Sequence, residues 1–179
     1  MNFARIVAVA VLASCFAVAG AQAKSKVDGT APSDAQIAGI VVATNQLDID
    51  AGRLARSRSQ NRNVQRFADQ MIKEHTAVNQ RATSLAKKLN VKPQDTEASR
   101  RLKTAGRDRQ EQLRGIQGPD FDRAYIDHEI AHHEQALDAL DKVLIPAARN
   151  AQLKELLHKV RPAVAEHLEH AKMLQATLD

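Results

Sequence analysis

Four ionisable residues of this sequence each occupy the only charged or titratable position in an otherwise apolar helical stripe. They are Asp48, His75, His133 and His167. Apolar residues that recur at steps of three and four lie on one face of a helix and form the seam between packed helices. An ionisable side chain in such a seam loses its water and needs a hydrogen-bond partner or a metal ion. The stripes are Ile37, Val41, Thr44, Asp48, Ala51 and Ala55; Val64, Ala68, Met71, His75, Val78, Ala82, Leu85 and Leu89; Ile126, Ile130, His133, Leu137, Leu140 and Leu144; and Leu153, Leu157, Val160, Val164, His167, Ala171, Leu174 and Leu178.

The spacing of these residues along the chain predicts that they lie at one level. Asp48 and His75 are about 12 and 15 residues from a turn expected near residues 60–61, which places both roughly 18–22 Å from it at the rise of an α-helix. His133 and His167 are about 15 and 18 residues from a turn expected near residues 148–149, or roughly 23–28 Å away. If the two hairpins pack with level ends, all four side chains meet in one layer.

Three imidazoles and a carboxylate in one layer form a set of metal ligands. Neutral imidazole binds zinc, copper, iron and nickel, and four such donors can complete the coordination of a divalent ion. We therefore predict a divalent transition metal held by His75, His133 and His167, with Asp48 as fourth ligand or as hydrogen-bond acceptor. Because protons compete for imidazole, the affinity should fall as the pH drops through about 6.5. Four glutamates close to the seam histidines are expected as further ligands or as acceptors for imidazole N–H groups: Glu74, Glu129, Glu134 and Glu166.

The alternative to a metal site is a packing role for the same residues. Each histidine would then be a core residue that hydrogen-bonds to Asp48, to another histidine or to water, as buried polar groups require. Two further pairs, His128 with His132 and His167 with His170, have the helical spacing of a surface chelate. Exposed helical histidines are the simpler interpretation of both pairs.

Five helical segments are expected to position these residues. Ser33 can cap the first helix, Pro93 ends the second, and Pro146 ends or bends the fourth. Pro162 is expected to kink the last helix just before His167. Helices are predicted over 34–58, 61–90, 118–144 and 149–178, with a mostly polar connecting helix over 96–114. No strand-type alternation longer than a few residues occurs, so the predicted fold class is all-α, a four-helix bundle with an additional connecting helix between its second and third main helices.

The first 23 residues have the pattern of a secretory signal peptide. Arg5 precedes an apolar run, and Ala21-Gln22-Ala23 matches a small-x-small cleavage site. The run is too short for an ordinary membrane-spanning helix, so we expect a periplasmic protein with no stable membrane insertion after cleavage. A lipoprotein anchored through Cys15 is the weaker alternative, because the apolar run continues past that cysteine. Residues 24–33 are expected to form a disordered lead-in, and residues 34–178 a single bundle domain.

Composition argues against several classes of partner and reaction. The formal net charge of +5 is small and dispersed, and aromatic residues make up only 3% of the chain, so a nucleic-acid partner is not expected. The basic residues of segment 96–114 could contact an anionic envelope surface weakly, although the acidic residues among them favour a solvated face. No Ser/His/Asp order and no glycine-rich phosphate loop occurs, so an enzyme ranks behind a binding protein. The sequence carries no signal for a particular oligomeric state.

The order and spacing of four short motifs carry a family resemblance. The motifs are Phe67-Ala68-x-x-Met71-x-x-x-His75, Phe121-Asp122-x-x-Tyr125-Ile126, His133-x-x-Ala136-Leu137 and Pro162-x-x-x-x-His167-Leu168-x-x-Ala171. Over residues 34–178 the chain resembles the secreted bacterial ferritin-like family called domain of unknown function 4142. The resemblance implies a ferritin-like helical bundle in the periplasm and no established activity.

The sequence departs from its related families at two places, and both departures affect the functional prediction. In the family that the chain resembles, a glutamate usually stands at the position of Asp48, whose shorter arm reaches less far towards a metal. Beside the seam histidines, the paired Glu-x-x-His motif of ferritins and di-iron oxidases is represented only by Glu129-x-x-His132, so iron storage and di-iron chemistry are not indicated. The leading hypothesis is a periplasmic bundle that binds a divalent metal. The alternative is a non-enzymatic structural or interaction module of the cell envelope whose buried histidines serve packing or pH response.

Overall fold

The computed structural model describes residues 31–178, and these residues form helices without any strand. The predicted all-α fold class is therefore confirmed. The predicted signal peptide over 1–23, most of the lead-in and Cys15 lie outside the described residues. No helix between residues 31 and 178 has both the length and the apolar character that a membrane-spanning helix needs. The elements are α1 (Asp34–Arg58), α2 (Arg62–Lys88), α3 (Glu97–Arg114), α4 (Gly118–Ala139), the π-helical turn η1 (Leu140–Leu144), α5 (Ile145–Ala147) and α6 (Ala151–Gln175).

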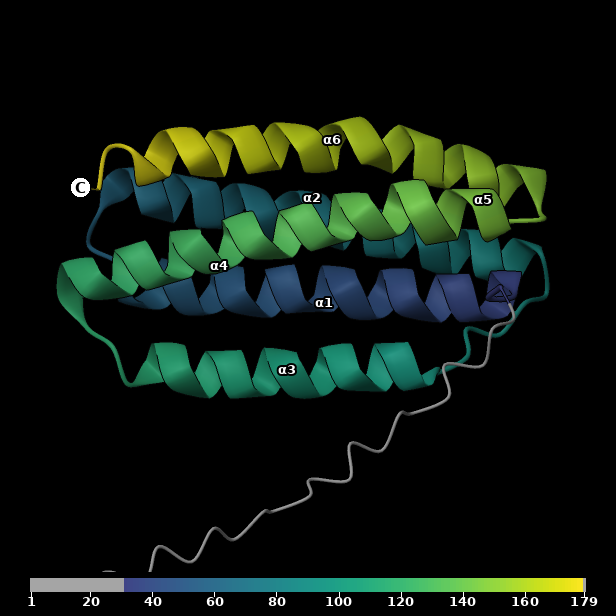
Figure 1. The fold of residues 1–179 in the computed structure, drawn as a ribbon, viewed down its shortest axis with the longest axis horizontal. Helices are drawn as coiled ribbons and strands as arrows, with labels where there is room; N and C mark the ends of the chain where they lie inside the picture. The colour runs from purple at the N-terminus through teal and green to yellow at the C-terminus, as the bar shows by residue number, and fades with distance from the viewer. Residues whose placement is uncertain (1–30, 179) are drawn as a thin grey trace, which may run out of the picture. The chain divides into compact units, whose positions relative to one another are not determined.

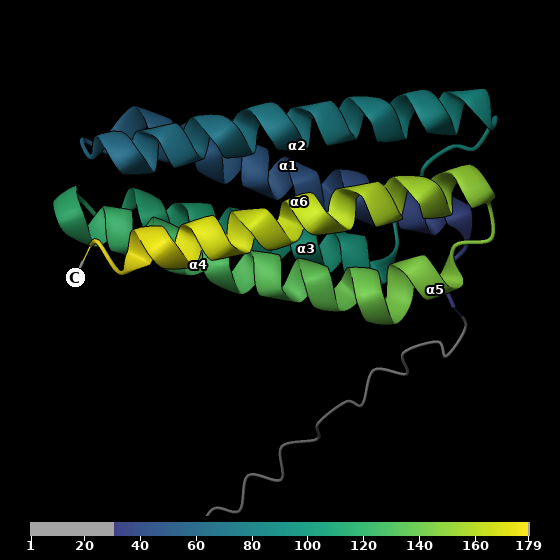
Figure 2. The same ribbon diagram turned by 90° about the horizontal axis from the view of Figure 1, so that it is seen from above.

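Two antiparallel hairpins form the bundle, as the spacing predicted. Helix α1 pairs with α2, helix α4 pairs with α6, and the hairpins meet through contacts of α2 with α6 and of α1 with α4 (Figure 1). The connecting helix α3 lies outside this bundle, mainly against α1 (Figures 1 and 2). Gly106 allows the close approach, because a Cβ atom there would lie 2.2 Å from Cδ2 of Leu47. Contact of α3 with an anionic envelope surface stays a prediction.

Side-chain caps begin the helices where the sequence indicates. The Ser33 hydroxyl accepts the N–H of Gln36, whose side chain in turn accepts the N–H of Ser33. The side chains of Asn61 and Asn150 accept first-turn N–H groups of α2 and α6. Such caps satisfy backbone donors that have no partner within the helix, which fixes the residue at which each helix starts.

Two apolar clusters fill the bundle, one on each side of a polar layer. The first cluster includes Ala51 of α1 and Ala171 of α6, which follow Asp48 and His167 along their helices. The second includes Val41 of α1, which precedes Asp48. The stripe positions predicted as the core are buried or half-buried throughout, so the seam prediction is confirmed. The histidines and Asp48 therefore sit midway along the bundle, where apolar packing excludes water from both sides.

The predicted helix over 118–144 ends its regular α-helical part at Ala139. The next turn is π-helical, and the N–H of Ile145 donates to the carbonyl oxygen of Leu140, five residues earlier. Pro146 follows directly, has no N–H, and would crowd the carbonyl four residues before it in a regular α-helix. The wider turn avoids this clash and directs both Leu140 and Leu144 into the core. Pro162, by contrast, does not interrupt α6, which remains one helix.

Truncation of Leu157 should destabilise the protein strongly. Its side chain is 1% exposed within the second apolar cluster, so Leu157→Ala removes buried methyl groups and leaves a cavity. We expect a loss of about 2–5 kcal/mol in the free energy of unfolding. Lys159→Ala on the same helix is the matched control, because it breaks only an exposed ion pair with Glu155 and should change stability by less than about 0.5 kcal/mol. Urea denaturation measures both, and equal effects would show that this part of the core is wrongly placed.

Candidate metal centre

Three of the predicted ligands converge from three different helices. His75 of α2, His133 of α4 and His167 of α6 have ring centroids 5.2 to 5.6 Å apart. One nitrogen of each ring lies within 4.8 Å of a nitrogen of each of the others. All three side chains are buried, and His133 is only 1% exposed. The three histidines therefore lie at one level along the bundle, as their spacing in the sequence predicted.

Fixed oxygen acceptors hold the rings of His75 and His133. Nδ1 of His75 lies 2.9 Å from Oδ1 of Asn45, and Nδ1 of His133 lies 2.8 Å from the backbone carbonyl oxygen of Glu129. The amide nitrogen of Asn45 donates to Asn79, which leaves its oxygen facing the histidine. Because both oxygens only accept, the hydrogen of each ring sits on Nδ1. The other nitrogen, Nε2, then carries a lone pair.

Glu74 holds the third ring in the same way. Its Oε2 lies 2.7 Å from Nε2 of His167. Burial acts to raise the pKa of Glu74, but its interactions with His167, Gln70 and His75 together outweigh burial and lower that pKa overall. The ionised carboxylate accepts the ring hydrogen at Nε2, so Nδ1 of His167 is the nitrogen left for a metal ion. Glu74 therefore has the acceptor role predicted for it.

The three remaining ring nitrogens have no hydrogen-bond partner among residues 31–178. They are Nε2 of His75, Nε2 of His133 and Nδ1 of His167. Burial lowers the pKa of His75, and it lowers the pKa of His133 to about 4, so both rings are neutral at neutral pH. At these two histidines protons therefore compete with a metal at a lower pH than the 6.5 predicted from the sequence. Three buried lone pairs without donors are an uncommon arrangement in a folded protein.

Asp48 approaches the three-histidine centre at Nδ1 of His75. Its Oδ2 lies 3.3 Å from Nδ1 of His75, the nitrogen that also faces Asn45 and not the one left unpartnered. The geometry suits an acceptor better than a fourth ligand of the three-histidine group. Burial acts to raise the pKa of Asp48, but the neighbouring histidines, first of all the charge and the hydrogen bond of His132, together outweigh it and lower that pKa.

His132 is a buried residue that the sequence interpretation placed on the surface. Its Nε2 lies 3.4 Å from Oδ1 of Asp48, and it also approaches His128. The cause is that α4 packs against several helices and buries a second face. A second stripe at steps of three and four could have revealed it, although its polar members hide the periodicity. That stripe comprises Asp122, Tyr125, Glu129, His132, Ala136 and Ala139.

Two other sequence expectations need correction. Glu134 and Glu166 lie on the surface, and Glu134 pairs with Lys172 at 3.3 Å. Each is the chain neighbour of a seam histidine, and one residue turns a helix by roughly 100°, so its side chain points elsewhere. His170 is half-buried, and its Nδ1 lies 3.1 Å from Oε1 of Gln70. Glu129, in contrast, is fully buried beside His133.

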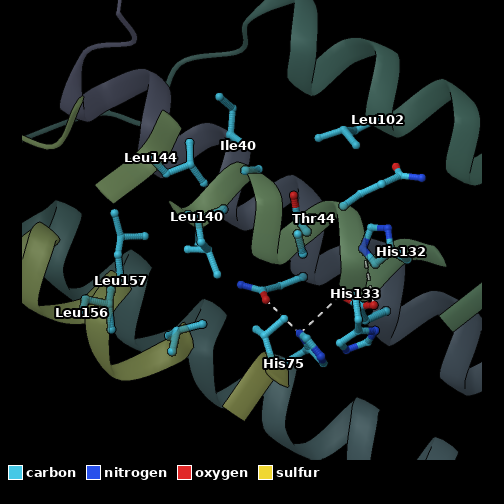
Figure 3. Close-up of a pocket in the computed structure, with 18 residues that line it drawn as sticks. Ile40, Thr44, His75, Leu102, His132, His133, Leu140, Leu144, Leu156 and Leu157 are labelled. Carbon is cyan, nitrogen blue, oxygen red and sulfur yellow. Dashed lines mark hydrogen bonds and ion pairs between the residues drawn. The ribbon is translucent and has the colours of Figure 1, made fainter. Parts of the chain in front are cut away.

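A cavity of about 100 Å³ adjoins the centre. Figure 3 shows His75, His132 and His133 gathered at one part of the lining, with leucines of η1 and α6 opposite them. Leu102 of α3 and the exposed Gln135 also line the cavity. The cavity therefore extends from near the surface to two of the three converging imidazoles.

Residues 19–174 match a family model described as a domain of unknown function, DUF4142. The chain belongs to the DUF4142 family. The predicted resemblance is thus confirmed, and it extends over most of this DUF4142 protein. The sequence matches no curated protein.

Two solved structures share the fold of this DUF4142 chain. A DUF305 protein from Streptomyces coelicolor, described as secreted, superposes with a TM-score of 0.70 at 12% identity, over 81% of this chain and 93% of that one. CopM, solved in its Cu(II)-bound form, superposes with a TM-score of 0.62 at 16% identity, over 82% of this chain and 98% of CopM. At such identities the likeness concerns the fold alone.

Proposed function

We propose that this DUF4142 protein binds a divalent transition-metal ion inside the bundle through His75, His133 and His167. The observation that carries the proposal is the convergence of three buried imidazole rings, each of which has one nitrogen without a partner within the described part of the chain. Each opposite ring nitrogen faces an acceptor, which orients the ring and raises its basicity, as around protein-bound metals. One ion supplies a partner for all three nitrogens.

Copper(II) is the ion that we expect to bind most tightly. Imidazole donors suit zinc, copper, iron and nickel, and divalent copper heads the affinity order for a given nitrogen site. The Cu(II)-bound form of CopM, a protein of similar fold, supports this choice. Nitrogen ligands at about 2.0–2.1 Å from a tetrahedral ion lie roughly 3.3 Å from one another. One nitrogen of each ring lies within 4.8 Å of the others in the structure, so the rings would move closer together around the ion.

The proposed place of action is the periplasm, reached through the predicted signal peptide over residues 1–23. The secreted character of the DUF305 protein of similar fold supports this proposal. The cavity gives an ion a route to His75 and His133. Since both are held in fixed orientations inside the bundle, the geometry suits metal retention better than turnover of a substrate.

A second candidate is a structural module whose buried histidines respond to pH. The specific observation in its favour is that the pKa values of two adjacent histidines in α4 are shifted in opposite directions. Burial lowers the pKa of His133 to about 4. Burial also acts to lower the pKa of His132, but the charge and the hydrogen bond of Asp48, together with weaker interactions, outweigh it and raise that pKa to about 9. Such a module would change stability with pH without taking up a metal.

Thermal unfolding with and without metal separates the two candidates. An ion that binds only the folded state raises stability by about 2.7 kcal/mol when it is present at 100 times its dissociation constant. We expect Cu²⁺ to raise the melting temperature of the exported protein, with Zn²⁺ and Ni²⁺ next. His167→Ala should remove most of this rise.

His158→Ala is the matched control, because His158 lies exposed on the same helix as His167. It should leave the rise intact. If no ion raises the melting temperature at neutral pH, or if His158→Ala and His167→Ala act equally, the proposed binding site is wrong and the pH-responsive module is favoured.

A further inference from the structure

The cavity beside the three-histidine centre is larger than the passage of a metal ion requires. Its volume is about 100 Å³. Protein interiors are closely packed and contain few voids larger than a water molecule, so a space of this size is a distinct feature of the bundle. Since an aliphatic cavity of about 150 Å³ accepts benzene, this one suits a molecule of about four to six non-hydrogen atoms.

Aliphatic side chains form most of the wall of this cavity. Leu140 and Leu144 of η1 contribute to the lining, and Leu156 and Leu157 of α6 continue it (Figure 3). Carbon atoms of this kind offer water no hydrogen bonds, whereas they pack favourably against another hydrocarbon. This part of the cavity therefore favours the hydrocarbon portion of a ligand over water.

The charges in the lining favour a neutral ligand. No lysine or arginine of the described residues lines the cavity, and its one carboxylate is that of Asp48. That carboxylate is already paired, with Oδ1 lying 3.4 Å from Nε2 of His132 and Oδ2 lying 3.3 Å from Nδ1 of His75. An ionised ligand would lose its water on entry and would find no unpaired opposite charge in return.

Two uncharged polar residues complete the lining. Thr44 of α1 is half-buried, and Gln135 of α4 is exposed where the cavity approaches the surface. A hydroxyl group and a carboxamide group can each donate and accept hydrogen bonds. A ligand hydroxyl group also does both, so it can bond to either residue in either sense. An alcohol combines this group with a hydrocarbon chain and carries no charge.

We propose that the cavity binds a short, uncharged alcohol, with its hydrocarbon chain against the leucines and its hydroxyl group towards the polar part of the lining. Half-buried Leu102 of α3 and exposed Gln135 of α4 place the entrance between these two helices. The site depends on the shape and lining of the cavity and does not rest on the proposed metal binding. For a ligand of about five non-hydrogen atoms we expect a dissociation constant on the order of 1 mM.

Titration of the metal-free exported protein with 1-butanol tests this site, with the leucine and valine methyl signals followed by NMR. The methyl signals of Leu140 and Leu157 should shift and saturate. Butyrate and butylammonium, which have the same chain length but carry a charge, should bind at least about 10-fold more weakly. Absence of saturable shifts with 1-butanol, or shifts confined to leucines outside the lining such as Leu113, would overturn the site. Equal binding of either ion would overturn its preference for a neutral ligand.

Ala136→Leu adds three carbon atoms to a residue of the lining and should weaken 1-butanol binding by at least about 10-fold, because it fills part of the cavity. Ala131→Leu is the matched control, since it makes the same change at an exposed position of α4 outside the lining and should bind as the wild type does. Ala139→Leu is a second lining variant if Ala136→Leu does not fold, as judged by circular dichroism. A folded lining variant that binds as tightly as the wild type contradicts the proposal. Because metal is absent throughout, such a failure leaves the three-histidine site untouched.

Discussion

Replacing His133 by alanine is expected to lower the affinity for Cu²⁺ by more than about 100-fold at neutral pH. Loss of a residue that only hydrogen-bonds to a ligand costs about 10–100-fold in metal affinity, and loss of the ligand itself should exceed that range. His133 contacts both other rings of the centre and contributes an unpartnered Nε2. Competition against a chelator of known affinity measures the change.

Asn45→Ala supplies the graded comparison. Asn45 donates to Asn79 and accepts from Nδ1 of His75, so it orients a ligand without offering an atom to the ion. Its removal should lower the affinity by about 10–100-fold, less than the loss of His133. Equal affinities for the two variants, or an effect of Asn45→Ala larger than that of His133→Ala, would mean that copper binds elsewhere in the protein.

The metal-free protein is expected to be most stable near pH 6.5. Burial lowers the pKa of His133 and of His128 to about 4 from 6.5, and it also lowers the pKa of His75. Between about pH 6.5 and 4 the unfolded chain binds protons at these histidines while the folded chain does not, so stability falls as the pH drops. The shift of His133 alone corresponds to a loss on the order of 3 kcal/mol. Glu129, which holds its proton in the folded state, opposes only part of this loss.

Stability should also fall as the pH rises above 6.5. Although burial disfavours the charged ring, the carboxylate of Asp48 raises the pKa of His132 to about 9. Between about pH 6.5 and 9 the folded chain therefore holds a proton that the unfolded chain has released, and the stability from this pair is lost towards pH 9.

Asp48→Asn tests the origin of the alkaline decline. The substitution removes the charge that holds the proton on His132, so the contribution of that histidine between pH 6.5 and 9 should disappear. Urea denaturation of wild type and variant from pH 4 to 9, with metal removed, measures the free energies of unfolding. A wild-type profile that is flat over this range would contradict the opposed pKa shifts.

Most of the fold follows from local sequence features. Helix α1 spans the predicted residues 34–58, because Ser33 caps its start and its stripe keeps steps of three and four. The π-helical turn at Leu140–Leu144 was not predicted, although Pro146 marks its place. A proline indicates that a helix must change there, but neighbouring packing decides whether it ends, bends or widens.

The candidate site was predicted only in part. The seam histidines were identifiable because each interrupts an apolar stripe, and Glu74 because it neighbours His75. Asn45 and His132 were missed as site residues, because polar residues on a second buried face of a helix resemble surface residues in the sequence. Only the packing of α4 against α1 and of α1 against α2 shows that these side chains are buried.

An anomalous-difference map from a crystal loaded with Cu²⁺ tests the central claim most directly. We expect a copper peak inside the bundle, within bonding distance of Nε2 of His75, Nε2 of His133 and Nδ1 of His167. A copper peak found only at surface residues such as His158, with the three buried rings unchanged and unbound, would contradict it.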